Sequence, residues 1–214
     1  MFKRSAIACV LLASFPGLAF SQGLGKTAPR TVQLGTPAPS DLIKIVKVTV
    51  GGVEITPGLP FAADDSWFNR LRIGIRNESA KEIVFVAGQL SFPETGDAEH
   101  LAIMDRILIG RRPEHAQGAT PAGRGFNDAP SPPILVGRGQ EISVPVADSF
   151  EAFKTAIEKR QSLSSVRTCV VGITTLYFDD GTEWLSGLYF RADPNTPGRY
   201  VRISPDQFRQ EASQ

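Results

Sequence analysis

The chain has 214 residues, a formal net charge of +1, 42% hydrophobic residues, two cysteines and two histidines. Its nearly balanced charge carries no basic stripe, which argues against nucleic acid as a partner. A chain of this length can bury a core without cross-links, and we expect one folded domain.

The N-terminus has the pattern of an export signal. Lys3 and Arg4 precede an apolar run at residues 6–12, and small residues stand at Ala19 and Ser21. This order is typical of a secretory signal peptide, and we place the cleavage after Ser21. The apolar run is too short to span a bilayer, so we predict a periplasmic or extracellular protein with no membrane span after cleavage.

Cleavage would leave Cys169 as the single cysteine, so no intramolecular disulfide is expected. Val171 and Ile173 follow it on the same side of a predicted strand, which favours a buried, inert thiol. The alternatives are an intermolecular disulfide or a nucleophile, which would need a nearby base such as His100 or His115.

Residues 22–40 are rich in Pro, Gly and Thr, and we interpret them as a flexible linker. The folded domain is predicted at residues 41–208, with a disordered tail at 209–214. Strands are expected at residues 43–50, 53–55, 70–77, 82–92, 101–109, 134–136, 141–146, 167–178 and 183–191. Residues 110–133 are rich in Arg, Pro, Gly and Ala and predict a mobile loop.

One short amphipathic helix is predicted after Asp148, with Phe150, Phe153 and Ile157 on one face. Residues 167–178 are β-branched on both faces, which predicts a central strand. An Asp-Gly hairpin turn at Asp180 would join this strand to residues 183–191. Residues 193–203 contain two prolines and predict an ordered extended loop.

Many short strands without βαβ alternation predict an all-β protein with two antiparallel sheets. We assign the immunoglobulin-like sandwich class, with one short helix before the last two strands. A small β-barrel is the alternative.

Carboxylates in turns suggest calcium as the only candidate cofactor, because calcium takes oxygen ligands from such loops. The candidate ligands are Asp179, Asp180, Asp193 and Asn195, although the hairpin turn alone explains Asp180-Gly181. No zinc spacing or serine-nucleophile motif occurs, and we predict no other cofactor and no catalytic residue.

Aromatic side chains suggest a ligand-binding surface, because they supply contact area at low entropic cost. Trp67 and Tyr200 stand beside turn residues and are the candidate ligand-binding residues. Trp184 shares a strand face with Leu188 and Phe190 and is expected in the core.

Two segments form a combined pattern. Residues 61–67 are followed further along the chain by Asn77-Glu78-Ser79, and residues 178–184 are followed by Asp193-Pro194-Asn195. Together they resemble an uncharacterised family of exported bacterial immunoglobulin-like β-sandwich proteins. The resemblance implies the fold and no defined activity.

The sequence therefore favours an exported, non-enzymatic binding or structural module of the cell envelope, with a protein or a surface polymer as its partner. The alternative is a hydrolase acting on envelope polymers. It would need a cleft with two or more polar groups of perturbed pKa.

Overall fold

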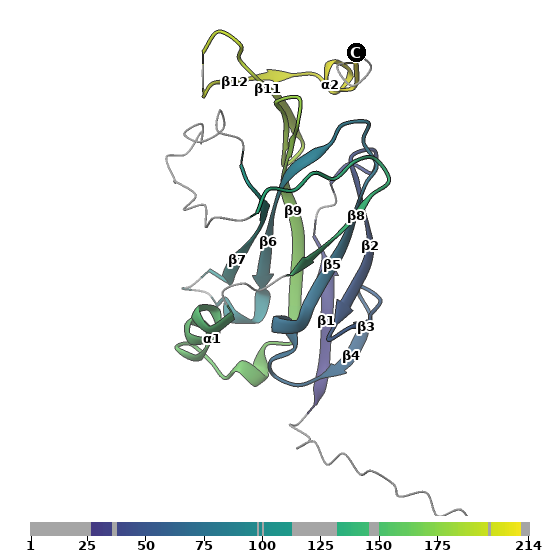
Figure 1. Ribbon diagram of the computed structural model, residues 1–214. Coiled ribbons are helices and arrows are strands. Elements are labelled where there is room, and N and C mark those ends of the chain that lie inside the picture. The colour runs from purple at the N-terminus through teal and green to yellow at the C-terminus, as the bar shows by residue number, and fades with distance from the viewer. Residues whose placement is uncertain are drawn as a thin grey trace, which may run out of the picture.

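The computed structural model describes residues 27–35, 38–97, 99, 101–112, 132–145, 150–196 and 198–210. These residues form two β-sheets packed face to face, which confirms the predicted all-β sandwich (Figure 1). The larger sheet is mixed rather than antiparallel as predicted, because one of its strand pairs, between residues 31–34 and 168–171, is parallel. The predicted signal peptide lies outside the described residues, and so do residues 113–131 of the predicted loop. Within the described part, no helix has the length and apolar character needed to cross a bilayer.

The larger sheet has eight strands in the order β12-β11-β10-β9-β1-β4, and β6 pairs with both β9 and β7. Its strands are β1 (Ala28–Leu34), β4 (Pro60–Ala63), β6 (Ile83–Phe92), β7 (Ile103–Gly110), β9 (Thr168–Phe178), β10 (Thr182–Leu185), β11 (Leu188–Ala192) and β12 (Tyr200–Ile203). The predicted central position of β9 is confirmed, because β9 pairs with β1, β6 and β10.

The smaller sheet has four antiparallel strands in the order β3-β2-β5-β8. These are β2 (Ile43–Val50), β3 (Val53–Glu54), β5 (Leu71–Asn77) and β8 (Glu141–Pro145). The strand predicted at residues 70–77 is confirmed, and its residues alternate, with Leu71, Ile73 and Ile75 buried and Arg72 and Arg76 on the other face.

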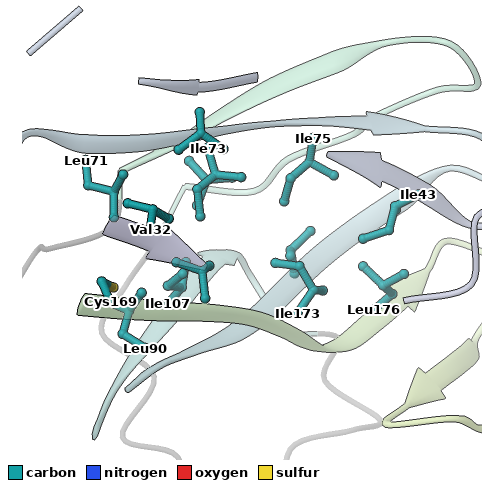
Figure 2. Close-up of a cluster of buried hydrophobic side chains, with 14 of the residues drawn as sticks. Val32, Ile43, Leu71, Ile73, Ile75, Leu90, Ile107, Cys169, Ile173 and Leu176 are labelled. Carbon is teal, nitrogen blue, oxygen red and sulfur yellow. The ribbon is translucent and has the colours of Figure 1, made fainter. Parts of the chain in front are cut away.

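The core fills the space between the two sheets. Figure 2 shows Leu71, Ile73 and Ile75 of the smaller sheet facing Val32, Ile173 and Leu176 of the larger sheet. Each of these side chains is almost completely buried. Burying such side chains stabilises the fold by roughly 1.5–3 kcal/mol each.

Two short helices lie at opposite ends of the sandwich (Figure 1): α1 (Phe150–Glu158) and α2 (Pro205–Gln210). Phe153 and Ile157 of α1 are buried, as its amphipathic pattern predicts. The described residues also include the 3-10 helices η1 (Trp67–Arg70), η2 (Pro93–Thr95) and η4 (Leu163–Ser165).

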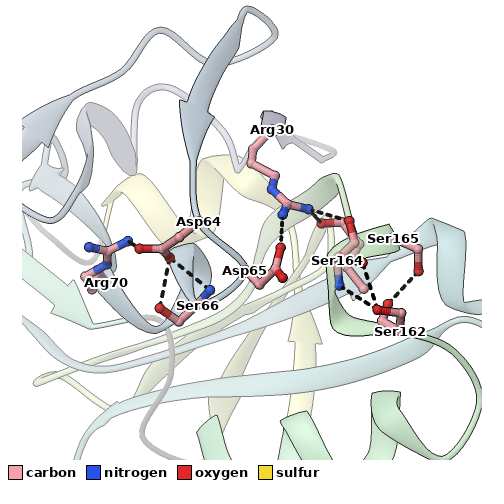
Figure 3. A network of polar contacts seen from close by, with 9 residues as sticks. Arg30, Asp64, Asp65, Ser66, Arg70, Ser162, Ser164 and Ser165 are labelled. Atoms are coloured by element: carbon pink, nitrogen blue, oxygen red, sulfur yellow. Dashed lines mark hydrogen bonds and ion pairs between the residues drawn. The ribbon is translucent and has the colours of Figure 1, made fainter. Parts of the chain in front are cut away.

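The prediction that residues 22–40 form a flexible linker is wrong where the structure describes them. Residues 28–34 are β1, which pairs in parallel with β9 and antiparallel with β4. Val32 of β1 is in the core, and the buried Arg30 side chain bonds to Asp65 and to the carbonyls of Ser164 and Val166 (Figure 3). The folded domain therefore begins before Asp41.

The C-terminal part is also more structured than predicted. Residues 183–191 form two strands, β10 and β11, because Ser186 and Gly187 have positive φ angles and reverse the chain. The predicted loop at 193–203 contains β12, and Arg209 and Gln210 of the predicted tail belong to α2. The segment 134–136 contributes only an isolated bridge, between Val136 and Ile83.

The helix α1 precedes four strands rather than two. The described chain has twelve strands, more than predicted, because β1, β4 and β12 went unrecognised and residues 183–191 divide into two. The immunoglobulin-like topology stays a prediction.

Candidate functional site

A groove of about 770 Å³ lies over the middle of β9. Seven small residues line it: Gly35, Ala38, Ser40, Ser91, Gly172, Ser186 and Gly187. Its larger lining residues include Gln89, Met104, Thr174 and Trp184. Its volume falls in the range of ligand clefts.

The groove lies where β9 changes its partner along one edge. Residues 168–171 of β9 pair with β1, whereas residues 175–177 pair with β10. The Gly35 amide donates to the Val171 carbonyl at 2.7 Å, and the Ser186 amide donates to the Thr174 carbonyl at 2.9 Å. Among the described residues, a gap between two partner strands therefore lies along the edge of β9.

A β-bulge accompanies this change of partner. The register between β6 and β9 shifts between Ala87 and Gly88, which lie opposite Thr175 and Ile173. A bulge bends a strand and increases its twist, so the two partners of β9 can diverge here. The carbonyls of Val171 and Thr174, three residues apart, both bond to strands on this edge, so the regular alternation of β9 is interrupted between them.

The floor of the groove is open to a ligand. A Cβ atom added to Gly172 or to Gly187 would have no heavy atom within 4 Å. A ligand can therefore approach the backbone of β9 closely at Gly172. None of the residues that line the groove carries an ionisable side chain. The groove is suited to binding by shape and hydrogen bonds.

A buried polar cluster lies on the same sheet. The register places Phe85, Tyr177 and Glu183 in one row across β6, β9 and β10. Arg112 donates from Nη2 to the Tyr177 hydroxyl at 2.9 Å and from Nε at 3.3 Å. Both Arg112 and Glu183 are 7% exposed.

Burial raises the pKa of the Glu183 carboxyl, although a hydrogen bond with Tyr177 and the charge of Arg112 oppose the rise. Burial also raises the pKa of the Tyr177 and Tyr200 hydroxyls, and the Glu183 charge adds to both shifts. These groups have the perturbed pKa values that the hydrolase alternative needs, although none of them lines the groove. The sequence pattern did not indicate it, because its members come from three separate segments.

The prediction that Trp67 forms a binding surface is wrong. Trp67 begins η1, and its side chain is fully buried. It packs edge-on against Phe61 and Phe68, with ring centroids 5.5 and 6.0 Å away. The turn residues before it bring the ring into the core rather than onto the surface. By contrast, the expected core position of Trp184 is confirmed, at 3% exposure.

Tyr200 lies at the start of β12 and is half-buried. Its ring packs edge-on against Tyr177, with centroids 6.2 Å apart. It belongs to a small second hydrophobic cluster around Phe85 and Ala87. The structure thus separates Tyr200 from Trp67 and places it beside the Arg112–Tyr177–Glu183 cluster.

The aspartates of the hairpin turn have protein partners. Asp180 pairs with Lys81 and accepts from the Thr182 amide and hydroxyl at 3.0 and 2.6 Å. Burial alone would raise the pKa of Asp180, but the bonds from Lys81 and Thr182 outweigh it and lower the pKa. Asp179 accepts from the Glu82 amide at 3.2 Å.

The other two calcium candidates lie in the turn after β11. Asp193 accepts from the Asn195 amide at 2.9 Å and lies 3.9 Å from Arg199 Nε. Across the described ranges, no three His, Cys, Asp or Glu side chains gather in one place. Calcium binding by these residues stays a prediction.

Cys169 is fully buried, as predicted, and burial raises the pKa of its thiol. This environment disfavours the thiolate and hence a nucleophilic role. His100 and His115 lie outside the described residues.

The sequence carried a weak signal for the groove. Gly172 interrupts an otherwise β-branched strand, and an isolated glycine in a strand often marks a bulge or a close backbone approach. Gly35 gave no such signal, because it lies in residues 22–40, which were predicted to form a flexible linker.

Comparisons with known proteins identify no relative: no family model, no curated protein and no solved structure matches the chain. The resemblance to exported immunoglobulin-like proteins stays a prediction.

Proposed function

We propose that this protein is an exported, non-enzymatic binding module of the cell envelope, and that its groove holds an extended peptide segment of a partner protein. The observation that carries the proposal is the groove over β9, which is open at Gly172 and lies between the ends of two partner strands. Peptides commonly bind by adding to such an open strand edge.

The lining of the groove favours a peptide over a sugar polymer. Gln89, Ser91 and Thr174 offer neutral hydrogen-bonding groups, and Met104 is 54% exposed at the rim. Sugar rings usually stack on an exposed aromatic face. The aromatic residue in this groove is Trp184, and only 3% of it is exposed.

Export to the periplasm or the cell exterior is part of the proposal, and its support is the signal-like N-terminus with Lys3, Arg4 and a cut after Ser21. The immunoglobulin-like class is also kept as a proposal. Two packed sheets fit that class, and many of its members bind partners, but a fold does not by itself fix a function.

The test uses a random peptide library displayed on phage, selected against the purified protein and followed by fluorescence polarisation with the recovered peptides. Gly172→Val fills the groove floor at a site with open space and no positive φ angle. We expect it to weaken peptide binding at least about tenfold, which corresponds to ~1.4 kcal/mol.

Gly137→Val is the matched control. Gly137 lies outside the groove, and an added Cβ would have its nearest neighbour at 3.5 Å. Peptides that bind both variants as tightly as the parent protein would rule out the groove as the binding site. Failure to recover any saturable peptide ligand would count against the proposed function itself.

The alternative function, hydrolysis of envelope polymers, is favoured by one observation. Glu183 is a buried carboxyl with a raised pKa, and Tyr177 and Arg112 lie beside it. A raised carboxyl pKa suits a general acid. If this alternative holds, the protein releases soluble fragments from purified cell-wall polymer and Glu183→Gln abolishes the release.

A further inference from the structure

We propose a second binding site, independent of the groove, on the outer face of the smaller sheet. A recess of about 380 Å³ there would bind a phosphoryl group through Lys47, Thr49, Arg72 and Ser143. The site is formed by β2, β5 and β8, on the sheet that does not contain the groove.

The strand register brings these four side chains together. Lys47 lies opposite Gly74, which in turn lies opposite Ser143, so the three residues form one row across the sheet. Thr49 lies opposite Arg72 in the next row on the same face. Side chains two residues apart on a strand share a face, so two cations and two hydroxyls surround Gly74.

Two local features shape the recess. A bulge in β2 between Ile45 and Lys47 shifts the register and places Lys47 in the outward row with Thr49. Bulges re-aim side chains in this way. Gly74 then lets Lys47 approach the centre of the sheet, because a Cβ at Gly74 would lie 3.1 Å from the Lys47 Cβ. Because Gly74 has no side chain, the space above it forms part of the recess.

The charges leave one guanidinium available. Within the described part of the chain, Arg72 has no ion pair, although it is exposed on a face with several carboxylates. Glu141, which also lines the recess, is held by Arg76 at 2.9 and 2.6 Å. Lys47 lies 3.8 Å from Glu54, a long contact in which both side chains are more than half exposed.

The donors suit a phosphoryl group better than a carboxylate. Arg72 supplies a planar fork that matches two oxygens, and Lys47 supplies a point charge. Thr49 and Ser143 add two hydroxyl donors. A tetrahedral oxyanion with three or more free oxygens can accept from all four residues at once, whereas a carboxylate has only two oxygens.

The experiment is an NMR titration of the purified protein with inorganic phosphate, glycerol phosphate and acetate at constant ionic strength. We expect saturable amide shifts at Lys47, Gly74 and Ser143 with both phosphates and a weaker response to acetate. Tighter binding of glycerol phosphate than of inorganic phosphate would identify an esterified phosphoryl group as the ligand. The reverse order would identify free phosphate.

Arg72→Gln should weaken phosphate binding about tenfold or more, since it removes the charged fork. Arg202→Gln is the matched control: Arg202 is an exposed strand arginine on the larger sheet, and its replacement should leave binding unchanged. Thermal melting checks that both variants remain folded. Shifts that do not saturate, equal binding of acetate, or equal loss in both variants would overturn the proposal.

Discussion

Arg30 offers the sharpest test of how the N-terminal strand is held in the fold. Its side chain is fully buried, and its guanidinium reaches three parts of the chain: the Ser164 carbonyl at 3.1 Å, the Val166 carbonyl and the Asp65 carboxylate (Figure 3). The perturbation is Arg30→Met, which keeps much of the apolar volume and removes every donor.

The expected cost follows from the groups left behind. Asp65 has 47% of its side chain exposed, so water can replace its lost partner at little cost. The Val166 carbonyl is buried, and an unsatisfied buried acceptor costs roughly 1–3 kcal/mol, whereas the bond to the Ser164 carbonyl is only partly buried and its loss adds a smaller cost. Removing the buried charge offsets part of this loss. We therefore expect Arg30→Met to lower the free energy of unfolding by about 3 kcal/mol.

The assay is equilibrium unfolding in urea at pH 7, with Asp65→Asn as a second variant and Arg202→Met as the exposed control. Asp65→Asn keeps both carbonyl bonds and should cost about 1–2 kcal/mol, because a buried charge loses its counterion. The control should change stability by no more than about 0.5 kcal/mol. If Arg30→Met is as stable as the parent protein, desolvation of the guanidinium outweighs its bonds and this reasoning is wrong.

Two further predictions concern buried ionisable groups. Burial raises the pKa of Glu183, so the folded state binds its proton more tightly than the unfolded chain does. The free energy of unfolding should therefore fall as the pH rises from about 4.3 through the folded pKa. Urea unfolding at a series of pH values measures this profile, and Glu183→Gln should flatten that part of it. Cys169 should resist a thiol reagent at pH 8 in the folded protein and react fully in denaturant, because its thiol is buried and its pKa is raised; rapid labelling of the folded protein would show that the thiol is accessible.

Local patterns in the sequence predicted the regular strands well. β5 shows strict alternation, and β9 is rich in β-branched residues. A Gly-Gly pair directly follows β2, and an Asp-Gly turn follows β9. Each of these elements is therefore encoded by residues within it or next to it. In α1 the spacing of Phe153 and Ile157 was enough to identify the buried face.

The missed elements depend on partners far away in the chain. β1 is held by its pairing with β9 and by the hydrogen bonds of Arg30 to Ser164 and Val166, which follow it by 134 and 136 positions. Nothing in the Pro- and Gly-rich segment itself indicates that pairing. The same limit explains Trp67, whose turn-rich surroundings suggested a surface position although the ring packs against Phe61 and Phe68. Burial of this kind is a property of the assembled sheets and not of local sequence.

The misassigned β1 segment is also what creates the candidate site. If β1 extended further along β9, its backbone would cover Gly172 and Ile173 and no gap would remain before β10. Among the described residues, the bond from Gly35, just after β1, to Val171 ends this pairing, and the β6–β9 bulge lies between it and the start of the pairing with β10. An open strand edge inside a sheet is normally a liability that proteins cover or pair. Its presence here, lined by small and neutral residues, supports the proposal that a bound segment completes the sheet.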